Sequence, residues 1–346
     1  MNEPLHLAVV GYGYWGPNLV RNFNAVDGVN VQSICEYNQL RRDQARLRYQ
    51  NIQLTDDFQS ILDDSAIDAI AIATPAASHH RLAMAAMNAG KHIFVEKPLA
   101  CNLNDALEMV ITARSLGLTL MVGHTFLYAP AVRKMREIVK AGDLGDILYV
   151  NAQRLNLGLF QKDINVVLDL APHDISILLW LIDEKPISVH CAGSSHYVDG
   201  IEDVATLCIT FPSGAFAIIT TSWLDPCKTR KFHVVGNRKM ITYDDLETLE
   251  KLRVYDKRVD VPPYFDGLGE FQCAYHYGDV ISPYFKQYEP LQMECAHFID
   301  CVRSGREPES GGEEALKVMQ VLDAAQRSLK TGGVPMPLEP IPPGSA

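Results

Sequence analysis

The chain has 346 residues and a formal net charge of −11; 47% of its residues are hydrophobic and 21% are charged. This length favours two domains and this composition is typical of a globular protein, whereas the acidic charge argues against general binding to nucleic acids, whose phosphates require a basic surface. No apolar run is long enough to span a membrane, the first residues show no signal-peptide pattern and the eight cysteines form no Cys-x-x-Cys pair, so we expect a cytoplasmic protein with reduced thiols and no membrane partner.

The first predicted strand, Leu5–Val10, leads into a glycine-rich turn, Gly11-Tyr12-Gly13-Tyr14-Trp15-Gly16, and Pro17 then opens a helix. The next predicted strand, Val29–Cys35, ends in Glu36. This order is typical of dinucleotide binding, because the glycines let the backbone approach a pyrophosphate and the acid accepts the ribose hydroxyls. We therefore predict that the cofactor contacts Gly11, Gly13, Tyr14, Trp15, Gly16 and Glu36.

Glu36 and the helix that follows it also bear on which cofactor binds. Glu36 favours NAD over NADP, because a carboxylate repels a 2′-phosphate. The arginines at positions 41, 42, 46 and 48 of the following helix keep NADP as an alternative, although they equally fit a solvated helix face.

Strand-like and helix-like segments continue to alternate up to residue 123. We predict strands at Asp68–Ala73, Lys91–Val95 and Leu118–Gly123, and helices at Ser78–Asn88 and Leu103–Leu116. Such alternation predicts a doubly wound parallel sheet, in which ligands bind beyond the carboxyl ends of the strands. The residues that follow those ends are Gly11, Glu36, Thr74-Pro75, Glu96-Lys97-Pro98 and His124.

Val167–Leu181 predicts a helix that is apolar almost all round, with Asp169 and His173 one turn apart on the same face. Pro172 predicts that both polar residues lie at the start of this helix, because proline in a helix interior removes a hydrogen bond. Burying a carboxylate and an imidazole among apolar side chains costs free energy unless the two groups are paired or serve in binding or catalysis. The spacing by itself leaves a structural Asp–His hydrogen bond and a catalytic pair equally open.

The second half of the chain contains runs of strand length separated by turn signals: Ile187–Ser195, Asp203–Phe211, Ala215–Trp223, Thr229–Gly236 and Met240–Tyr243. We expect a long loop in the tyrosine-rich segment 263–290, helices at Leu291–Arg303 and Glu313–Lys330, and a poorly ordered Pro/Gly tail at 331–346. His297 and Cys301 are four residues apart, but no second pair joins them, so we expect no metal site.

Taken together, these motifs resemble the Gfo/Idh/MocA oxidoreductases, named for glucose–fructose oxidoreductase and inositol dehydrogenase. The features that carry the resemblance occur in the family's order: the glycine turn 11–16, Ala73-Thr74-Pro75 with His79, Glu96-Lys97-Pro98, Gly123-His124, and Asp169-x-x-x-His173-Asp174. The resemblance implies an α/β fold with a Rossmann nucleotide domain (1–123). It also implies a second α/β domain (124–346) with a large, mostly antiparallel, open-faced sheet through which subunits associate as dimers or tetramers. It adds Thr74, Pro75, His79, Glu96, Lys97 and His124 to the predicted cofactor contacts.

Oxidising a secondary alcohol moves a hydride to the nicotinamide and requires a base for the hydroxyl proton. The resemblance assigns the acid/base role to His173 and places Lys97 on the same oxygen, with Asp169 supporting the pair. The resemblance therefore predicts Lys97, Asp169 and His173 as catalytic residues that also touch the substrate.

Within the family, segments 123–130, 222–226 and 243–246 are similar to members that act on nucleotide-linked sugars, the 3-dehydrogenases and 3-ketoreductases. Tyr128 lies in the first of these segments. A diphosphate needs cations, for which Lys228, Arg230 and Arg154 are the candidates. The expected reaction is NAD(P)-dependent hydride transfer at the 3-position of such a sugar. The alternatives are a dehydrogenase of a free polyol, inositol or unlinked sugar, and a non-catalytic NAD-binding redox sensor.

Overall fold

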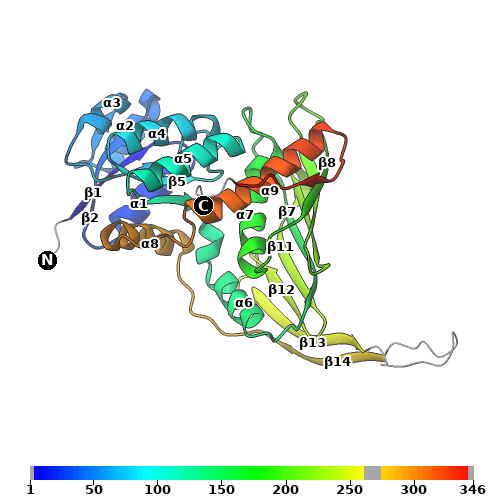
Figure 1. Ribbon diagram of the computed structural model, residues 1–346. Coiled ribbons are helices and arrows are strands. Elements are labelled where there is room, and N and C mark those ends of the chain that lie inside the picture. The colour runs from blue at the N-terminus through cyan, green and yellow to red at the C-terminus, as the bar shows by residue number, and fades with distance from the viewer. Residues whose placement is uncertain (1–3, 261–273, 342–346) are drawn as a thin grey trace.

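The computed structural model describes residues 4–260 and 274–341. The chain forms two sheets, one towards each end of the molecule, with helices packed around and between them (Figure 1). No helix in these two ranges is long and apolar enough to cross a membrane.

The first sheet is entirely parallel and has the strand order β3-β2-β1-β4-β5-β6. This is the order of a doubly wound dinucleotide-binding sheet, so the predicted fold class of the first domain is confirmed. Two elements, β3 and α3, are too short to have been predicted from periodicity. The strands are β1 (Leu5–Val10), β2 (Val29–Cys35), β3 (Gln53–Thr55), β4 (Ala69–Ile72), β5 (His92–Glu96) and β6 (Leu120–Gly123).

The connecting helices begin at capping residues that are present in the sequence. Asn38, Asp57 and Asn102 each accept a backbone N–H in the first turn of the helix that follows, which satisfies donors that would otherwise lack a partner. These helices and short 3₁₀ turns are α1 (Gly16–Asn24), α2 (Gln39–Arg48), α3 (Phe58–Asp63), η1 (Ala76–Ser78), α4 (His79–Asn88) and α5 (Leu103–Ser115).

Helix α7 (Val166–Leu181) differs from the prediction at its start. Asn165 caps it, accepting the N–H of Leu168 at 3.2 Å, so Pro172 lies inside the helix rather than in its first turn. Pro172 has no N–H to donate to the carbonyl of Leu168 one turn earlier. The fully buried side chains of Val166 and Val167 offset this loss, because they are removed from water only if the helix starts before the proline.

The second sheet has the order β14-β13-β12-β11-β7-β10-β9-β8-β15. Neighbouring strands are antiparallel except for β7 and β10, which confirms the predicted open, mostly antiparallel sheet. The strands are β7 (Ile147–Leu157), β8 (Ser188–Ser194), β9 (Val204–Thr210), β10 (Phe216–Ser222), β11 (Leu224–Gly236), β12 (Met240–Asp244), β13 (Leu252–Asp260), β14 (Ala274–Ile281) and β15 (Met336–Pro337).

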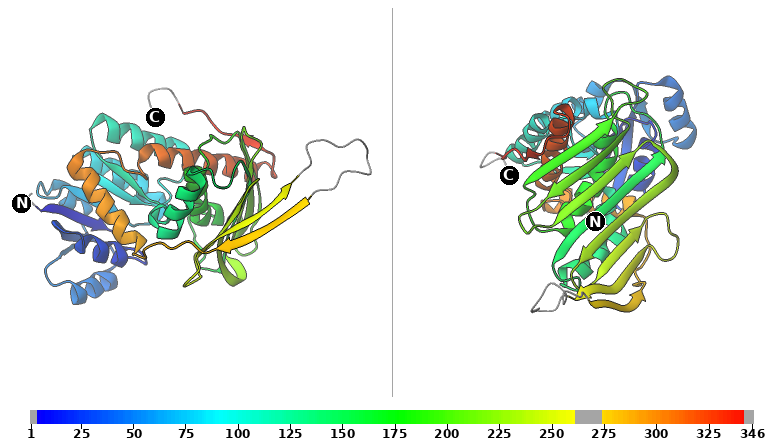
Figure 2. Two further views of the ribbon diagram at one scale, coloured as in Figure 1. Left: turned by 90° about the horizontal axis from the view of Figure 1, so that it is seen from below. Right: turned by 90° about the vertical axis from the view of Figure 1, so that its right-hand side faces the viewer.

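Helices cover one face of this sheet and leave the other bare over the described part of the chain (Figure 2). Helices α7 and α9 (Gly312–Lys330) pack on the covered face. The short turn η2 (Thr125–Tyr128) and helix α6 (Pro130–Lys140), which was not predicted, lead into β7.

Two predictions for the end of the chain were wrong within the described residues. Part of the expected loop 263–290 is β14, which pairs with β13, and β-branched and aromatic residues such as Tyr275, Tyr277 and Val280 favour that conformation. Part of the expected unstructured tail is β15, which pairs with β8. Residues 263–273 and 342–346 lie outside the described residues.

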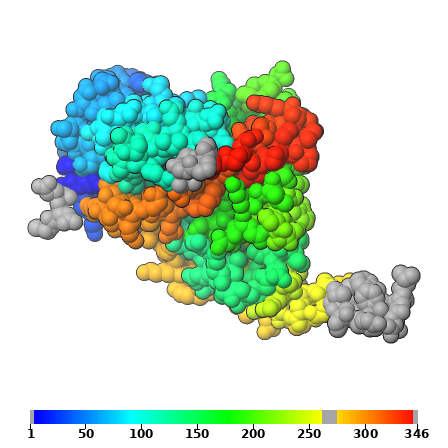
Figure 3. Space-filling view, in the orientation of Figure 1, coloured from blue at the N-terminus to red at the C-terminus, as the bar shows by residue number. Residues whose placement is uncertain are grey.

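Helix α8 (Pro290–Ser304) returns to the first sheet, although it belongs to the second half of the chain. The ring of Phe298 packs edge-on against Phe23 and Phe94, with centroids 6.1 and 5.7 Å away. Arg21 on α1 forms an ion pair with Glu289 at the start of α8. In Figure 3 this helix lies along the lower surface of the nucleotide domain and joins the two parts of the molecule.

Candidate active site

A large cleft lies between the two sheets, at the carboxyl ends of the first sheet's strands, and residues of both domains line it. Its volume is about 1490 Å³, which exceeds the 300–1,000 Å³ or so of an ordinary small-molecule pocket. The cleft therefore has room for a dinucleotide together with a second ligand.

The glycine turn between β1 and α1 is packed too tightly for side chains. A Cβ at Gly11, whose φ is +95°, would lie 2.6 Å from the carbonyl oxygen of Ala73, and a Cβ at Gly16 would lie 2.2 Å from that of Gly11. No side chain caps α1, so its first N–H groups remain available to an anion. The turn fits the pyrophosphate of a dinucleotide. Gly11, Gly13, Tyr14 and Trp15 line the cleft, while Gly16 lies just behind them as the first residue of α1.

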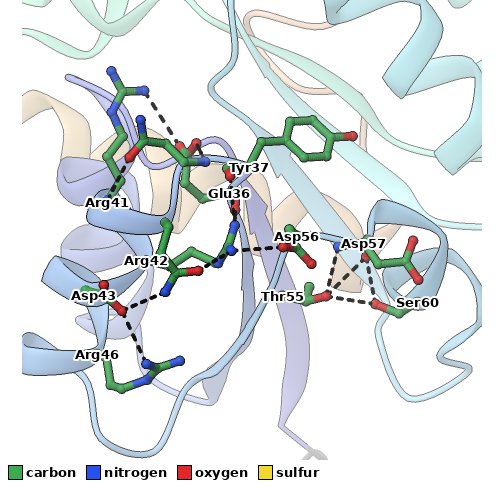
Figure 4. Close-up of polar contacts among 12 residues, drawn as sticks. Glu36, Tyr37, Arg41, Arg42, Asp43, Arg46, Thr55, Asp56, Asp57 and Ser60 are labelled. Carbon is green, nitrogen blue, oxygen red and sulfur yellow. Dashed lines mark hydrogen bonds and ion pairs between the residues drawn. The ribbon is translucent and has the colours of Figure 1, made fainter.

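Glu36, at the end of β2, is fixed at the expected ribose position (Figure 4). One carboxylate oxygen accepts the N–H of Tyr12 at 2.7 Å, and the other accepts the N–H of Asn38 at 2.8 Å. Each oxygen keeps a lone pair for a ribose hydroxyl. The carboxylate is thus a rigid acceptor facing the cleft.

The arginines that follow Glu36 are mostly engaged with the protein. Arg42 donates to the carbonyl oxygens of Glu36 and Tyr37 and pairs with Asp56, and Arg46 pairs with Asp43. Arg41 is about half exposed, lines the cleft and lies 3.8 Å from the Glu36 carboxylate. Among these side chains, Arg41 is the one placed to meet a 2′-phosphate.

The loop after β4 contributes Thr74 and Pro75 to the cleft. His79, also predicted as a cofactor contact, lies behind this loop. Its two ring nitrogens are 2.9 Å from the carbonyl oxygen of Thr74 and 2.8 Å from that of Pro98. The structure therefore places His79 as a support for the loop rather than on the cleft wall.

Lys97 and Asp169 meet across the two domains. The ammonium of Lys97 is 3.0 Å from Oδ1 of Asp169 and 2.6 Å from its backbone carbonyl oxygen. The second carboxylate oxygen, Oδ2, accepts the indole N–H of Trp223 at 3.0 Å. Asp169 is therefore bound to Lys97 and Trp223, and the structural Asp169–His173 hydrogen bond left open by the spacing is not formed.

His173 lines the cleft beside Lys97. Its ring packs edge-on against Phe126 with centroids 5.0 Å apart, and its Nδ1 has no partner among the described residues. Burial, followed by the positive charges of Lys97 and Arg154, holds the pKa of His173 well below its ordinary value. The imidazole is therefore neutral at pH 7 and can accept a proton.

Arg154 was predicted to bind a phosphate, but its guanidinium is satisfied within the protein. It forms two hydrogen bonds of 2.9 Å to the carboxylate of Asp174 and lies 4.4 Å from the ring centroid of Phe126. Both charged side chains are buried. A buried, bidentate pair has no free charge to offer a diphosphate, so Arg154 supports the wall around His173 instead.

Two other predicted residues lie away from the cleft wall. The hydroxyl of Tyr128 is 3.2 Å from Oγ of Ser310 in the interior. His124 is buried, and burial together with the charge of Lys97 lowers its pKa to about 4. Neither residue lines the cleft.

The remaining predicted cations, Lys228 and Arg230 of β11, also line the cleft. Arg230 is paired with Asp245 at 3.1 Å. Lys228 has no hydrogen-bond or ion-pair partner within residues 4–260 and 274–341, which makes it the more available of the two for an anionic ligand.

Models of two domains of one family match the chain. Residues 5–124 match the oxidoreductase family with an NAD-binding Rossmann fold, and residues 132–242 match the GFO/IDH/MocA C-terminal domain. The chain belongs to the Gfo/Idh/MocA oxidoreductase family. Its first domain is therefore an NAD-binding domain, and the protein is an NAD(P)-dependent enzyme.

Known Gfo/Idh/MocA proteins similar to this chain have diverse substrates. It is 25% identical to scyllo-inositol 2-dehydrogenase (NAD⁺) of Bacillus subtilis over 96% of both chains. It is 29% identical to UDP-N-acetylglucosamine 3-dehydrogenase of Acidithiobacillus ferrooxidans, over 58% of this chain and 63% of that one. The fold matches the crystal structure of GenD2 from gentamicin A biosynthesis in complex with NAD, with a TM-score of 0.82, 22% identity and 98% of both chains covered.

Several residues on the wall of the cleft were not predicted to be functional. They include Arg81, Phe126, Asn156, Leu159, Gln161, Asp163, Trp223 and Asp245. Most come from the loop after β7 or from single strand ends, where no periodicity or spacing marks a site. Phe126, Trp223 and Asp245 fall within the segments that resemble nucleotide-sugar enzymes, which is the one signal that could have identified them.

Two buried carboxyl groups, Glu96 and Glu294, lie near each other. Burial raises the pKa of Glu96 to about 7. Glu294 on α8 accepts the hydroxyl of Thr125 at 2.7 Å, and burial and the charge of Glu96 raise its pKa well above its usual range. No sequence signal identified Glu294, because a glutamate in a helix usually faces solvent.

We predict that Glu294→Gln stabilises the protein at alkaline pH. A carboxyl group whose pKa is higher in the folded state binds an extra proton there, so its contribution to stability is lost as the pH rises from about 4.5 through the folded pKa. The variant should gain about 1 to 3 kcal/mol in free energy of unfolding at pH 8, and much less at pH 5. Chemical denaturation at both pH values measures this.

The control is Glu137→Gln, on the exposed face of α6, where the side chain is 66% exposed. This variant should change neither value by more than about 0.5 kcal/mol. An equal effect of Glu294→Gln at both pH values would show that Glu294 is ionised throughout.

Proposed function

We propose that the protein transfers a hydride between NAD(P) and a ring hydroxyl or ketone of a sugar, with Lys97, Asp169 and His173 as its catalytic residues. The observation that carries the proposal is that the ammonium of Lys97 and the imidazole of His173, from different domains, line the same cleft as the glycine turn. A proton donor, a proton acceptor and a dinucleotide site are thereby brought together. This is the set that alcohol oxidation requires.

The roles follow from charge and contact. Neutral His173 accepts the hydroxyl proton of the sugar, and in the reverse direction its protonated form returns that proton to the carbonyl oxygen. Lys97 donates a hydrogen bond to the same oxygen, and Asp169 holds the ammonium in place. When bound, the nicotinamide accepts or returns the hydride.

The cofactor contacts are assigned to the lining residues Gly11, Gly13, Tyr14, Trp15, Glu36, Thr74, Pro75, Glu96 and Lys97. Because both oxygens of Glu36 are fixed by backbone N–H groups, the carboxylate cannot swing away from a 2′-phosphate without losing them. This favours NAD. Arg41 is the residue that would support NADP.

We propose that the sugar is linked to a nucleotide and reacts at its 3-position. The large cleft supports this, because it is lined by Lys228, whose ammonium has no partner within the described residues. The similarity to a UDP-N-acetylglucosamine 3-dehydrogenase also supports it. A free polyol or inositol is the alternative, favoured by the acidic Asp163 that also lines the cleft.

We predict that His173→Ala lowers kcat by about 100-fold or more, the usual scale for an acid/base group, while binding of NADH is retained. Steady-state kinetics and NADH fluorescence titration measure the two quantities. His6→Ala is the control, because His6 lies on β1 and pairs with Asn30 outside the cleft. Near-normal turnover of His173→Ala would remove the histidine from the mechanism.

We predict that Lys228→Ala raises the KM for a nucleotide sugar by roughly 10-fold, the scale of a charged hydrogen bond, without changing the KM for the unlinked sugar. Lys231→Ala is the matched control, since Lys231 lies on β11 like Lys228 but pairs with Asp244 of β12 and is not part of the cleft wall. Unchanged KM values in Lys228→Ala would favour the free polyol, and no turnover on any sugar would favour a redox sensor.

We propose that copies of the chain associate through the bare face of the second sheet. Tyr149 and Phe216 stack on neighbouring strands of this sheet with centroids 5.8 Å apart, and both remain partly exposed. Apolar rings on an uncovered sheet face are typical of a subunit interface.

A native mass that is a multiple of the 38.5 kDa chain is expected, and Phe216→Asp should reduce it. The control is Leu249→Asp, an exposed residue in the turn after β12. A wild-type mass of one chain contradicts this proposal.

A further inference from the structure

Trp223 lines the cleft and binds a predicted catalytic group, although in the sequence only its position in segment 222–226 marked it. It lies between β10 and β11, and its side chain is 1% exposed. Its indole N–H donates to Oδ2 of Asp169 at 3.0 Å, while Lys97 holds Oδ1. Each oxygen of this carboxylate therefore has its own donor, one from each domain.

The backbone of Trp223 is equally well anchored. Its N–H donates to the carbonyl oxygen of Asp203, and its carbonyl oxygen accepts the N–H of Gly158. These bonds place the indole at the root of the loop 158–164, which lines the cleft through Leu159, Gln161 and Asp163. The position of the indole is thus set by the sheet and not by the catalytic residues.

The face of the indole is covered by that same loop. The ring of Phe160 lies 5.4 Å from that of Trp223 and 5.3 Å from that of Tyr197. Trp223 is also 1% exposed, and a hydrogen bond to a charged group is strongest where water is excluded.

We propose that Trp223 is a positioning residue, which holds the Asp169 carboxylate so that the ammonium of Lys97 stays directed at the reacting oxygen. The proposal rests on the proposed function of Lys97 and Asp169. Without the indole N–H, the carboxylate can rotate about its side-chain bonds and carry the ammonium with it. A displacement of about 1 Å at a reacting group costs on the order of 100-fold in rate.

The test is Trp223→Phe, which removes the N–H and keeps an aromatic ring. We expect kcat to fall between about 10- and 100-fold, with the KM for the sugar changed less than about 3-fold. NADH binding should be unchanged, because the indole bonds to Asp169 and not to the glycine turn. A purely structural role would lower the amount of folded, NADH-binding enzyme but leave kcat per bound NADH unchanged.

Trp180→Phe is the matched control. It makes the same substitution on α7, the helix that carries Asp169, but Trp180 packs under Arg136 with the guanidinium 3.9 Å from its ring centroid and is not part of the cleft wall. Its kcat and KM should equal those of the wild type. An equal fall in kcat per bound NADH in both variants, or no fall in either, would overturn the proposal.

A double-mutant cycle tests whether Trp223 acts through Asp169. In an Asp169→Asn background, Trp223→Phe should change single-turnover rates less than about 3-fold, because the group it positions is already altered. Persistence of the full decrease would assign Trp223 a separate role.

A measurement on the wild-type protein covers the case in which Trp223→Phe does not fold. The chain has three tryptophans, so its indole N–H resonances can be assigned by Trp15→Phe and Trp180→Phe. The Trp223 resonance should be protected from solvent exchange and should shift in Asp169→Asn. A rapidly exchanging or unshifted resonance would contradict the bond. This NMR measurement needs no substrate. A failure of the proposed function would instead appear as an absence of turnover by the wild type, so the two failures can be distinguished.

Discussion

The contact between Lys97 and Asp169 is the interaction on which the cleft depends, because it joins the end of β5 in the nucleotide domain to α7 in the second domain. Both side chains are largely removed from water, with 18% and 16% of their surface exposed. Such a pair is stable only if its remaining donors and acceptors are satisfied. The backbone carbonyl of Asp169 and the indole of Trp223 satisfy them, so the pair also fixes the spacing between the two domains.

The same arrangement sets the charge of the neighbouring groups. Burial, followed by the positive charges of Lys97 and Arg154, holds the pKa of His173 well below its ordinary value, while Asp174 is paired with Arg154. The buried carboxyl group of Glu294 has no cation of its own, and burial raises its pKa. The cleft therefore brings an ammonium and a neutral imidazole together, and the proposed hydride transfer rests on these two groups.

The second structural constraint is the return of α8 to the nucleotide domain. The packing of Phe298 between Phe23 and Phe94, together with the ion pair of Glu289 with Arg21, binds the end of the chain to its beginning. Because α8 also carries Glu294 beneath the cleft, the two halves of the molecule share one interior. The motifs predict a domain boundary at residue 123, but α8 lies after this boundary and packs on the first domain.

The sequence by itself determined the class of each sheet, the glycine turn, Glu36 and the order of the family's motifs, because these depend on residues that are neighbours in the chain or recur with a fixed period. The tertiary structure alone decided which partners the polar groups have. Asp169 binds Lys97, 72 residues away, and Trp223, 54 residues away, while Arg154 is neutralised by Asp174 and Tyr128 faces the interior. No local pattern encodes such contacts, since they arise only when separate elements pack and each buried polar group must find a partner.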